Sequence, residues 1–141
     1  MRGWITGPRG QWGIRVLFAV ALLFVAWQSL VPAAQILVQA PSDTMSHFAA
    51  YAILGFLAAL SVPRWRWPLA VVVVTVFGSL LEVSQSHTQY RAFEFADIAA
   101  DAVGAAVGAA LAVGLIAMWR RRKSTHSHGR TSTGGGAGTT Q

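Results

Sequence analysis

The sequence contains no cysteine, and this absence excludes disulfide bonds, thiolate metal sites and cysteine nucleophiles. Charged residues are also scarce: they make up 11% of the 141 residues, whereas about a quarter of a soluble protein is charged. Hydrophobic residues make up 54% of the chain. The length fits one domain, and the composition indicates a membrane protein rather than a soluble one.

The basic residues are the second feature that narrows the function. The formal net charge is +6, which on its own could suggest nucleic-acid binding. However, ten of the eleven lysines and arginines lie at the N-terminus, in one short central segment or in the C-terminal tail. Because no basic helix face carries stacking aromatic residues, nucleic acid is not predicted as a partner.

Four apolar stretches approach the length of about 20 residues that crosses a bilayer. They cover, approximately, residues 13–31, 46–62, 67–86 and 96–119. The fourth stretch is mostly alanine, valine, glycine and leucine, and small residues let helices pack closely in lipid. The predicted fold class is all-α, a compact four-transmembrane-helix bundle. Residues 1–12 are expected to precede it as a cytoplasmic segment, and residues 120–141 to follow it as a basic and then disordered tail.

The first stretch also has features of a cleaved signal peptide. It follows basic residues, has an apolar core and ends in Val31-Pro32-Ala33. The residues Trp27-Gln28-Ser29 interrupt the apolar core just before this cleavage sequence. The three spans that follow must be oriented in the membrane whether or not the first is cleaved. A retained membrane anchor is therefore the favoured interpretation.

The basic residues also predict the orientation. Both termini and the segment with Arg64 and Arg66 are basic, whereas the two other connections share only Arg91. Because basic loops stay in the cytoplasm, both termini are predicted to be cytoplasmic, with the four spans in the inner membrane. Two histidines of the tail, His126 and His128, are interpreted as solvated side chains rather than a metal site.

All five acidic residues lie on the opposite side from the basic termini. They are Asp43, Glu82, Glu94, Asp97 and Asp101. The third span runs outward and the fourth runs inward, so Glu82, Asp97 and Asp101 are expected at similar depths near the outer surface.

Three of the expected helices carry polar residues and glycines at steps of three or four, which places them on one helix face. These residues are Asp43, His47, Tyr51 and Gly55; Gly78, Glu82, Gln85 and Gln89; and Asp97, Asp101, Gly104 and Gly108. Glycine permits close backbone contact, so Gly78, Gly104 and Gly108 are predicted to pack helices together. The spacing of Gly104 and Gly108 suits packing within one chain or a homo-oligomer.

Each polar residue also has a purely structural interpretation. Asp97 could stabilise a helix N-terminus, Tyr51 could sit at the membrane interface, and Gln85 could join two helices. Glu82 differs, since an ionisable group within a span costs several kcal/mol unless it is paired. Taken together, the residues predict a polar binding pocket that opens to the outer surface. It consists of Asp43, His47, Tyr51, Glu82, Gln85, Arg91, Asp97 and Asp101.

The order and spacing of these residues resemble the VanZ-like family of bacterial integral membrane proteins. That family's pattern resembles Ser-Asp-Lys followed by His and Tyr, then Glu-x-x-Gln, an Arg, and Asp-x-x-x-Asn-x-x-Gly-x-x-x-Gly. The matching residues here are Ser42, Asp43, His47, Tyr51, Glu82, Gln85, Arg91, Asp97, Gly104 and Gly108. Two positions depart from the pattern: Thr44 stands where lysine is usual, and Asp101 where asparagine is usual. Two acids one turn apart would repel each other or share a proton.

The resemblance implies a bacterial membrane protein, and some relatives are associated with resistance to lipid-bearing glycopeptide antibiotics. It implies no settled reaction. The first hypothesis is therefore a protein that binds an envelope lipid, a lipid-linked precursor or a lipophilic glycopeptide, with Arg91 and His47 near a phosphate or amide. Membrane lipids are the expected partners.

Two other hypotheses use the same acidic residues. An intramembrane enzyme could use His47 with Glu82 or Asp97 for acid–base chemistry on a lipid-linked substrate. Alternatively, it could hold a divalent metal, since mixed carboxylate and imidazole ligands suit zinc or manganese. No cofactor is otherwise predicted, and no serine lies in a recognisable nucleophile motif. A small proton-coupled transporter is the third hypothesis, although four spans form a thin pathway without oligomerisation.

Overall fold

A computed structural model describes residues 7–31, 35, 37, 42–86 and 95–128 of the chain. Its helices are α1 (Pro8–Leu30), α2 (Asp43–Ser61), α3 (Trp67–Ser86) and α4 (Phe95–His128), with the short 3-10 helix η2 (Arg64–Arg66) between α2 and α3. All four α-helices are long and apolar enough to cross a membrane, and the described residues contain no strand. The prediction of an all-α fold with four helices able to span a membrane is confirmed.

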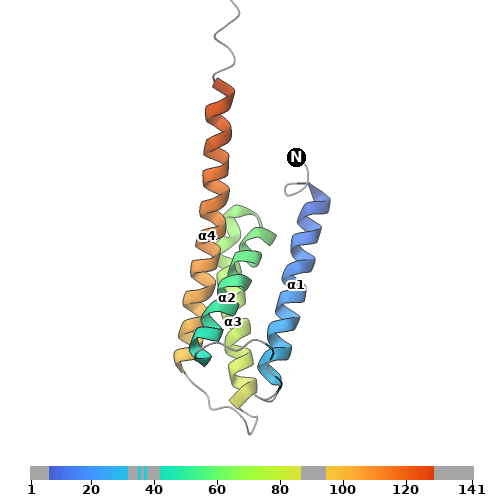
Figure 1. Cartoon of the computed structure of the whole chain (residues 1–141), viewed down its shortest axis with the longest axis vertical. Coiled ribbons are helices and arrows are strands. Elements are labelled where there is room, and N and C mark those ends of the chain that lie inside the picture. The colour runs from blue at the N-terminus through green and yellow to red at the C-terminus, as the bar shows by residue number, and fades with distance from the viewer. Residues whose placement is uncertain (1–6, 32–34, 36, 38–41, 87–94, 129–141) are drawn as a thin grey trace, which may run out of the picture.

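The helices α2, α3 and α4 form the body of the bundle, and α1 lies along its side (Figure 1). The core consists of Tyr51, Leu54 and Ala58 of α2, Ala70 and Val74 of α3, and Ala105 of α4. No residue of α1 is buried, although Phe18, Ala21, Leu22 and Val25 pack against this core. The first helix is thus an accessory to a three-helix body.

Close contact between α2 and α4 depends on three glycines. A side chain at Gly55 would collide with the backbone of Ala105. Side chains at Gly104 and Gly108 would collide with the carbonyl oxygens of Phe48 and Ala52. The face with Gly104 and Gly108 is therefore used within the chain, and α2 packs most extensively against α4.

Local sequence signals explain where the helices begin. Pro8 occupies the first turn of α1, where its missing N–H costs nothing. The Ser42 side chain accepts a hydrogen bond from the Met45 backbone N–H at 3.2 Å and so caps α2. Asp43 and Asp97 lie in the first turns of α2 and α4, where the helix dipole favours negative charge.

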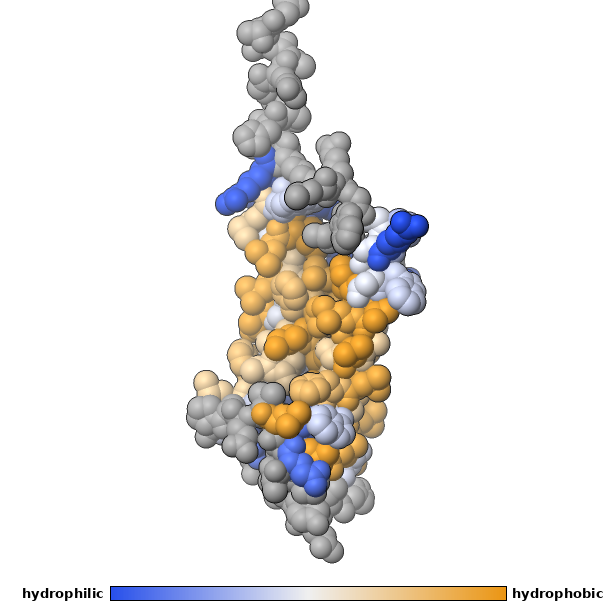
Figure 2. Space-filling view, turned by 45° about the vertical axis from the view of Figure 1, so that its right-hand side comes forward, coloured by the Kyte–Doolittle hydropathy of each residue, from blue (hydrophilic) through white to orange (hydrophobic). Residues whose placement is uncertain are grey.

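Two contacts show which helix ends meet. The Arg15 guanidinium donates to the Ser61 carbonyl oxygen at 3.4 Å, near the start of α1 and the end of α2. The Gln85 side chain donates to the Ser29 carbonyl oxygen at 2.8 Å, near the ends of α3 and α1. We call the end where α2 and α4 begin the acidic end, and the opposite end the basic end. Figure 2 shows an apolar band between them, as expected for a lipid-facing surface.

Helix α4 is longer than the sequence indicated. It continues past Trp119 to His128 and projects beyond the other helices at the basic end (Figure 1). The expectation of irregular chain immediately after Lys123 is therefore wrong for residues 124–128. Arginine and lysine are good helix formers, and positive charge near a helix C-terminus is favourable, so the basic cluster extends the helix. Residues 129–141 of the predicted tail lie outside the described residues.

Candidate functional site

Three helices bring polar side chains together inside the acidic end. We call this group the polar cluster, and it consists of His47 and Tyr51 of α2, Glu82 and Gln85 of α3, and Asp97 and Asp101 of α4. Each of these side chains belongs to a residue that is no more than 8% exposed. Burying several ionisable groups within a membrane bundle is costly, and such groups usually mark a functional site.

His47 is the centre of the polar cluster. Its Nδ1 atom lies 2.9 Å from Asp101 Oδ1, which is hydrogen-bond distance. Its Nε2 atom lies 3.9 Å from Asp97 Oδ2, which is too long for a hydrogen bond. When Nδ1 carries the proton and donates to Asp101, the lone pair of Nε2 faces toward Asp97.

Thr44 is a hydrogen-bonding neighbour of the polar cluster that the sequence did not place in the predicted pocket. Its hydroxyl donates to Asp97 Oδ1 at 2.8 Å, so this oxygen is already engaged. The sequence did contain a signal for this contact, because Thr44 is one turn before His47 on the same expected helix face. It was interpreted only as the loss of a family lysine.

Tyr51 and Gly78 shape the inner wall of the polar cluster. The rings of His47 and Tyr51 are nearly parallel, with an angle of 3° between their planes and 6.2 Å between their centres. A side chain at Gly78 would collide with Asp101 Oδ2 and with the Tyr51 ring. Gly78 therefore provides the space into which the Asp101 carboxyl fits. Gly78 thus permits the close approach of a polar side chain as well as of a neighbouring helix.

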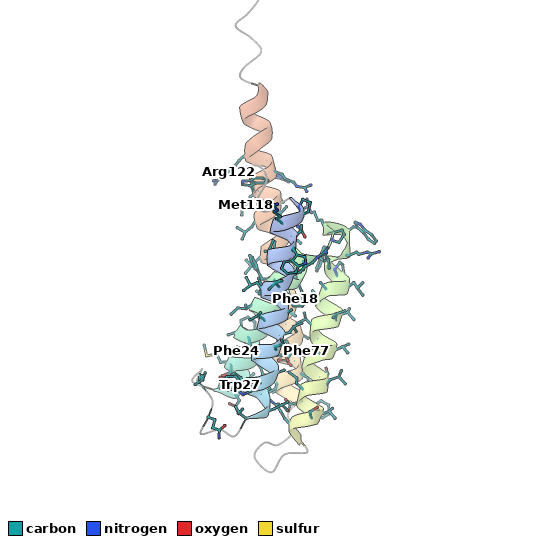
Figure 3. The ribbon with its side chains drawn as sticks, turned by 90° about the vertical axis from the view of Figure 1, so that its right-hand side faces the viewer. Phe18, Phe24, Trp27, Phe77, Met118 and Arg122 are labelled. Carbon is teal, nitrogen blue, oxygen red and sulfur yellow. The ribbon has the colours of Figure 1, made fainter. Side chains whose placement is uncertain are left out.

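Gln85, three residues after Glu82 on α3, connects α3 to α1. Its amide nitrogen donates to the Ser29 carbonyl oxygen, and the residue is 1% exposed. A backbone acceptor leaves no trace in the sequence, so Ser29 could not have been identified beforehand. Figure 3 shows α1 crossing in front of the other helices, with Phe18, Phe24 and Trp27 along it.

Of the remaining predicted pocket residues, the structure describes Asp43 alone, and Asp43 does not join the buried group. Asp43 is exposed in the first turn of α2. Arg91, and Gln89 of the α3 stripe, lie outside the described residues. The described side chains therefore form a packed polar group, whereas the sequence suggested a pocket open to the outer surface.

Three members of the polar cluster could hold a metal ion. His47, Glu82 and Asp97 are buried, and each offers one ligand atom such that all three atoms lie within 4.8 Å of one another. One imidazole nitrogen and two carboxylate oxygens form a donor set that transition metals accept. The cluster could also move protons, since His47 lies between two carboxyl groups.

A family model described as VanZ/LLP1 matches residues 12–118 of the chain. The matched range includes every residue of the polar cluster and most of each of the four candidate membrane spans. No curated protein and no solved structure matches the chain significantly.

Proposed function

The chain belongs to the VanZ-like family of membrane proteins, and from this premise we propose that its polar cluster binds the polar group of an envelope amphiphile. The amphiphile is an envelope lipid, a lipid-linked precursor or a lipophilic glycopeptide. Binding takes place at the outer leaflet of the bacterial cytoplasmic membrane, and a protective role against such glycopeptides follows from it.

The observation that carries this proposal is the burial of ionisable groups from three helices at one end of the bundle. Glu82, Asp97 and Asp101 are each at most 5% exposed, although a bundle held by packing alone needs none of them. Glycine contacts between α2 and α4 already bring the helices together. Ionisable groups buried at this cost within a membrane bundle are best explained by a ligand that they bind.

The charge distribution supports the outer leaflet. The basic end contains the arginines of η2 and Arg15, which lies near Ser61. The C-terminal half of α4 lies at the same end. Because basic segments remain in the cytoplasm, this end faces inward, with both termini cytoplasmic. The polar cluster then faces the outer leaflet, where envelope precursors and glycopeptides are found.

Exposed apolar side chains near the cluster suit the hydrocarbon part of an amphiphile. Phe95 is 79% exposed at the start of α4, and Leu80, two residues before Glu82 and on the outer side of α3, is 62% exposed. A ligand could place its polar group among the carboxyls while its chains contact these side chains in the bilayer. This arrangement explains why a buried polar group lies beside a lipid-facing surface.

The proposal is tested with purified protein in nanodiscs made from bacterial lipid extract, by native mass spectrometry of retained amphiphiles. Wild-type protein should retain a specific amphiphile, and Glu82→Gln should lose most of it. Ser84→Ala is the matched control, because Ser84 is exposed and its hydroxyl donates to the Leu80 carbonyl of its own helix. Equal retention by wild-type protein and Glu82→Gln would refute the proposal.

A second candidate function, catalysis on the bound amphiphile, is favoured by the His47–Asp101 contact of 2.9 Å. An imidazole that is oriented by a carboxylate can act as a general base through its other nitrogen. Incubating wild-type protein and His47→Gln with lipid-linked substrates would detect this activity as a product absent from the variant. Intact substrate with both proteins would leave binding as the function.

A further inference from the structure

We propose that the polar cluster binds one divalent transition-metal ion through His47 Nε2, Glu82 and Asp97. The ion leaves coordination positions that accept a phosphate oxygen of the amphiphile. This inference rests on the proposed function for the identity of the amphiphile. It adds that the metal ion is the group that holds the amphiphile. Metal binding itself is measurable without any amphiphile.

The arrangement of the three ligand atoms is the first argument. They come from α2, α3 and α4 and lie within 4.8 Å of one another. Zinc binds imidazole nitrogen and carboxylate oxygen at about 2.1 Å, so two ligands of one ion lie roughly 3–4 Å apart. The distance of 3.9 Å between His47 Nε2 and Asp97 Oδ2 is in this range. It is too long for a direct hydrogen bond.

The second argument is that the other atoms of two ligands are already held. His47 Nδ1 bonds to Asp101 Oδ1 at 2.9 Å, and Asp97 Oδ1 accepts from the Thr44 hydroxyl at 2.8 Å. Metal-bound histidines usually donate their second N–H to a carboxylate, and metal-bound carboxylates usually accept a hydrogen bond. Asp101 and Thr44 are therefore positioning residues, which orient His47 and Asp97 toward the same point.

The third argument is the balance of charge. Glu82, Asp97 and Asp101 are three carboxyl groups, whereas the sequence assigns only His47 and Arg91 as cations to this region. Asp101 is fully buried, and its Oδ2 atom has no hydrogen-bond partner among the residues that the structure describes. Uncompensated negative charge is costly in a low-dielectric interior. A divalent cation would offset it.

The donor set also selects the kind of ion. Magnesium and calcium prefer oxygen ligands, whereas an imidazole nitrogen favours zinc or another transition metal. Three protein ligands leave at least one position for water or a phosphate oxygen. The cation would thereby allow an acidic cluster to hold an anionic head group that the carboxyls alone would repel.

The test uses the full-length chain, treated with a chelator and then titrated with zinc chloride by isothermal calorimetry. Histidines outside the cluster could bind zinc, so His87, His126 and His128 are replaced by glutamine in every protein, and no histidine tag is used. The parent should bind about one zinc per chain. Glu82→Gln and Asp97→Asn should lose this binding, whereas Ser84→Ala should retain it.

The positioning residues have a separate readout. Thr44→Val and Asp101→Asn should weaken zinc binding by about 10- to 100-fold while one site per chain remains. Thr44→Ser should restore the parental affinity, because it keeps the hydroxyl. A cobalt-loaded parent should show visible absorption bands of a low-symmetry site, and these bands should shift in Asp101→Asn. Thermal unfolding of each variant shows whether it is folded.

Several outcomes would overturn the inference. These are the absence of stoichiometric zinc in a folded parent, and zinc binding that survives both Glu82→Gln and Asp97→Asn. Amphiphile retention in nanodiscs, measured with and without chelator, separates the two proposals. Retention that is unchanged by chelator contradicts the metal and supports the proposed function. Zinc binding that depends on Glu82 without any retained amphiphile supports the metal and contradicts the proposed function.

Discussion

His47 of α2 and Asp101 of α4 meet through Nδ1 and Oδ1 at 2.9 Å, in the interface between the two helices that pack most extensively against each other. Gly104 follows Asp101 by three residues and contacts the backbone of Phe48, next to His47. The same helix crossing therefore fixes the polar contact and the glycine contact. Because the two are linked, perturbing one is expected to disturb the other.

Replacing Asp101 tests the polar part of this crossing. Asp101→Ala leaves the buried His47 Nδ1–H without its acceptor and should destabilise the protein by about 1–3 kcal/mol. Asp101→Asn retains an oxygen acceptor and should unfold within a few degrees of the wild type. Thermal unfolding in detergent, followed by circular dichroism, measures both. Equal melting temperatures for Asp101→Ala and the wild type would show that the contact contributes nothing.

Replacing glycines of α4 tests the packing part. Gly108→Ala places a methyl group against the Ala52 backbone. Unlike the end of a flexible side chain, this backbone cannot move aside. Overpacking of this kind costs about 1–3 kcal/mol, so the melting temperature should fall. Gly114→Ala is the matched control on the same helix, because nothing lies within 4 Å of that position. Alanine is the better helix former, so the control should be neutral or slightly stabilising.

The four helices could be predicted because hydrophobic length and charge placement are properties of the sequence. The stripes of polar residues and glycines also predicted that His47, Glu82 and Asp101 belong together, since residues at steps of three or four share a helix face. Helix boundaries were less accurate. Asp43 begins α2, although the apolar span was expected to start at residue 46, because capping residues are polar and lie outside the apolar pattern.

Other features could not be predicted for physical reasons. The choice between packing within the chain and packing against a second copy is invisible at Gly104 and Gly108, because both use the same spacing. The hydrogen bond from Gln85 ends on a backbone carbonyl, which every residue possesses. The depth of burial was also unexpected. An open pocket was predicted, whereas Asp101 is fully enclosed, since Gly78 lets the neighbouring helix approach.

Gln85 should control how firmly α1 is attached. Its hydrogen bond to Ser29 at 2.8 Å joins α1 to α3, and no residue of α1 is buried. Gln85→Glu has nearly the same shape but replaces the donating nitrogen with an oxygen. We expect it to lower the melting temperature and to speed proteolysis at the end of α1. Ser84→Ala should change neither quantity, and identical proteolysis of Gln85→Glu would mean that apolar contacts alone hold α1.

The orientation can be measured directly because the natural chain contains no cysteine. A single cysteine introduced at Gln89 should react with a membrane-impermeant maleimide in intact spheroplasts, since this position follows the acidic end of α3. A cysteine introduced at Ser132, beyond α4, should react only after the membrane is opened. The reverse pattern would place the polar cluster at the inner leaflet and contradict the proposed orientation.

Thr44 offers the sharpest test of the charge balance. Its hydroxyl lies 2.8 Å from Asp97 Oδ1, so a lysine at this position would place an ammonium group beside the same carboxylate. Thr44→Lys should therefore bind zinc at least tenfold more weakly than Thr44→Ser, because the new cation competes with the metal for Asp97 and repels it. Isothermal calorimetry in the background without other histidines compares the two. Unchanged zinc affinity in a folded Thr44→Lys protein would show that Asp97 does not bind the ion, since a ligand so close to an added positive charge must respond to it.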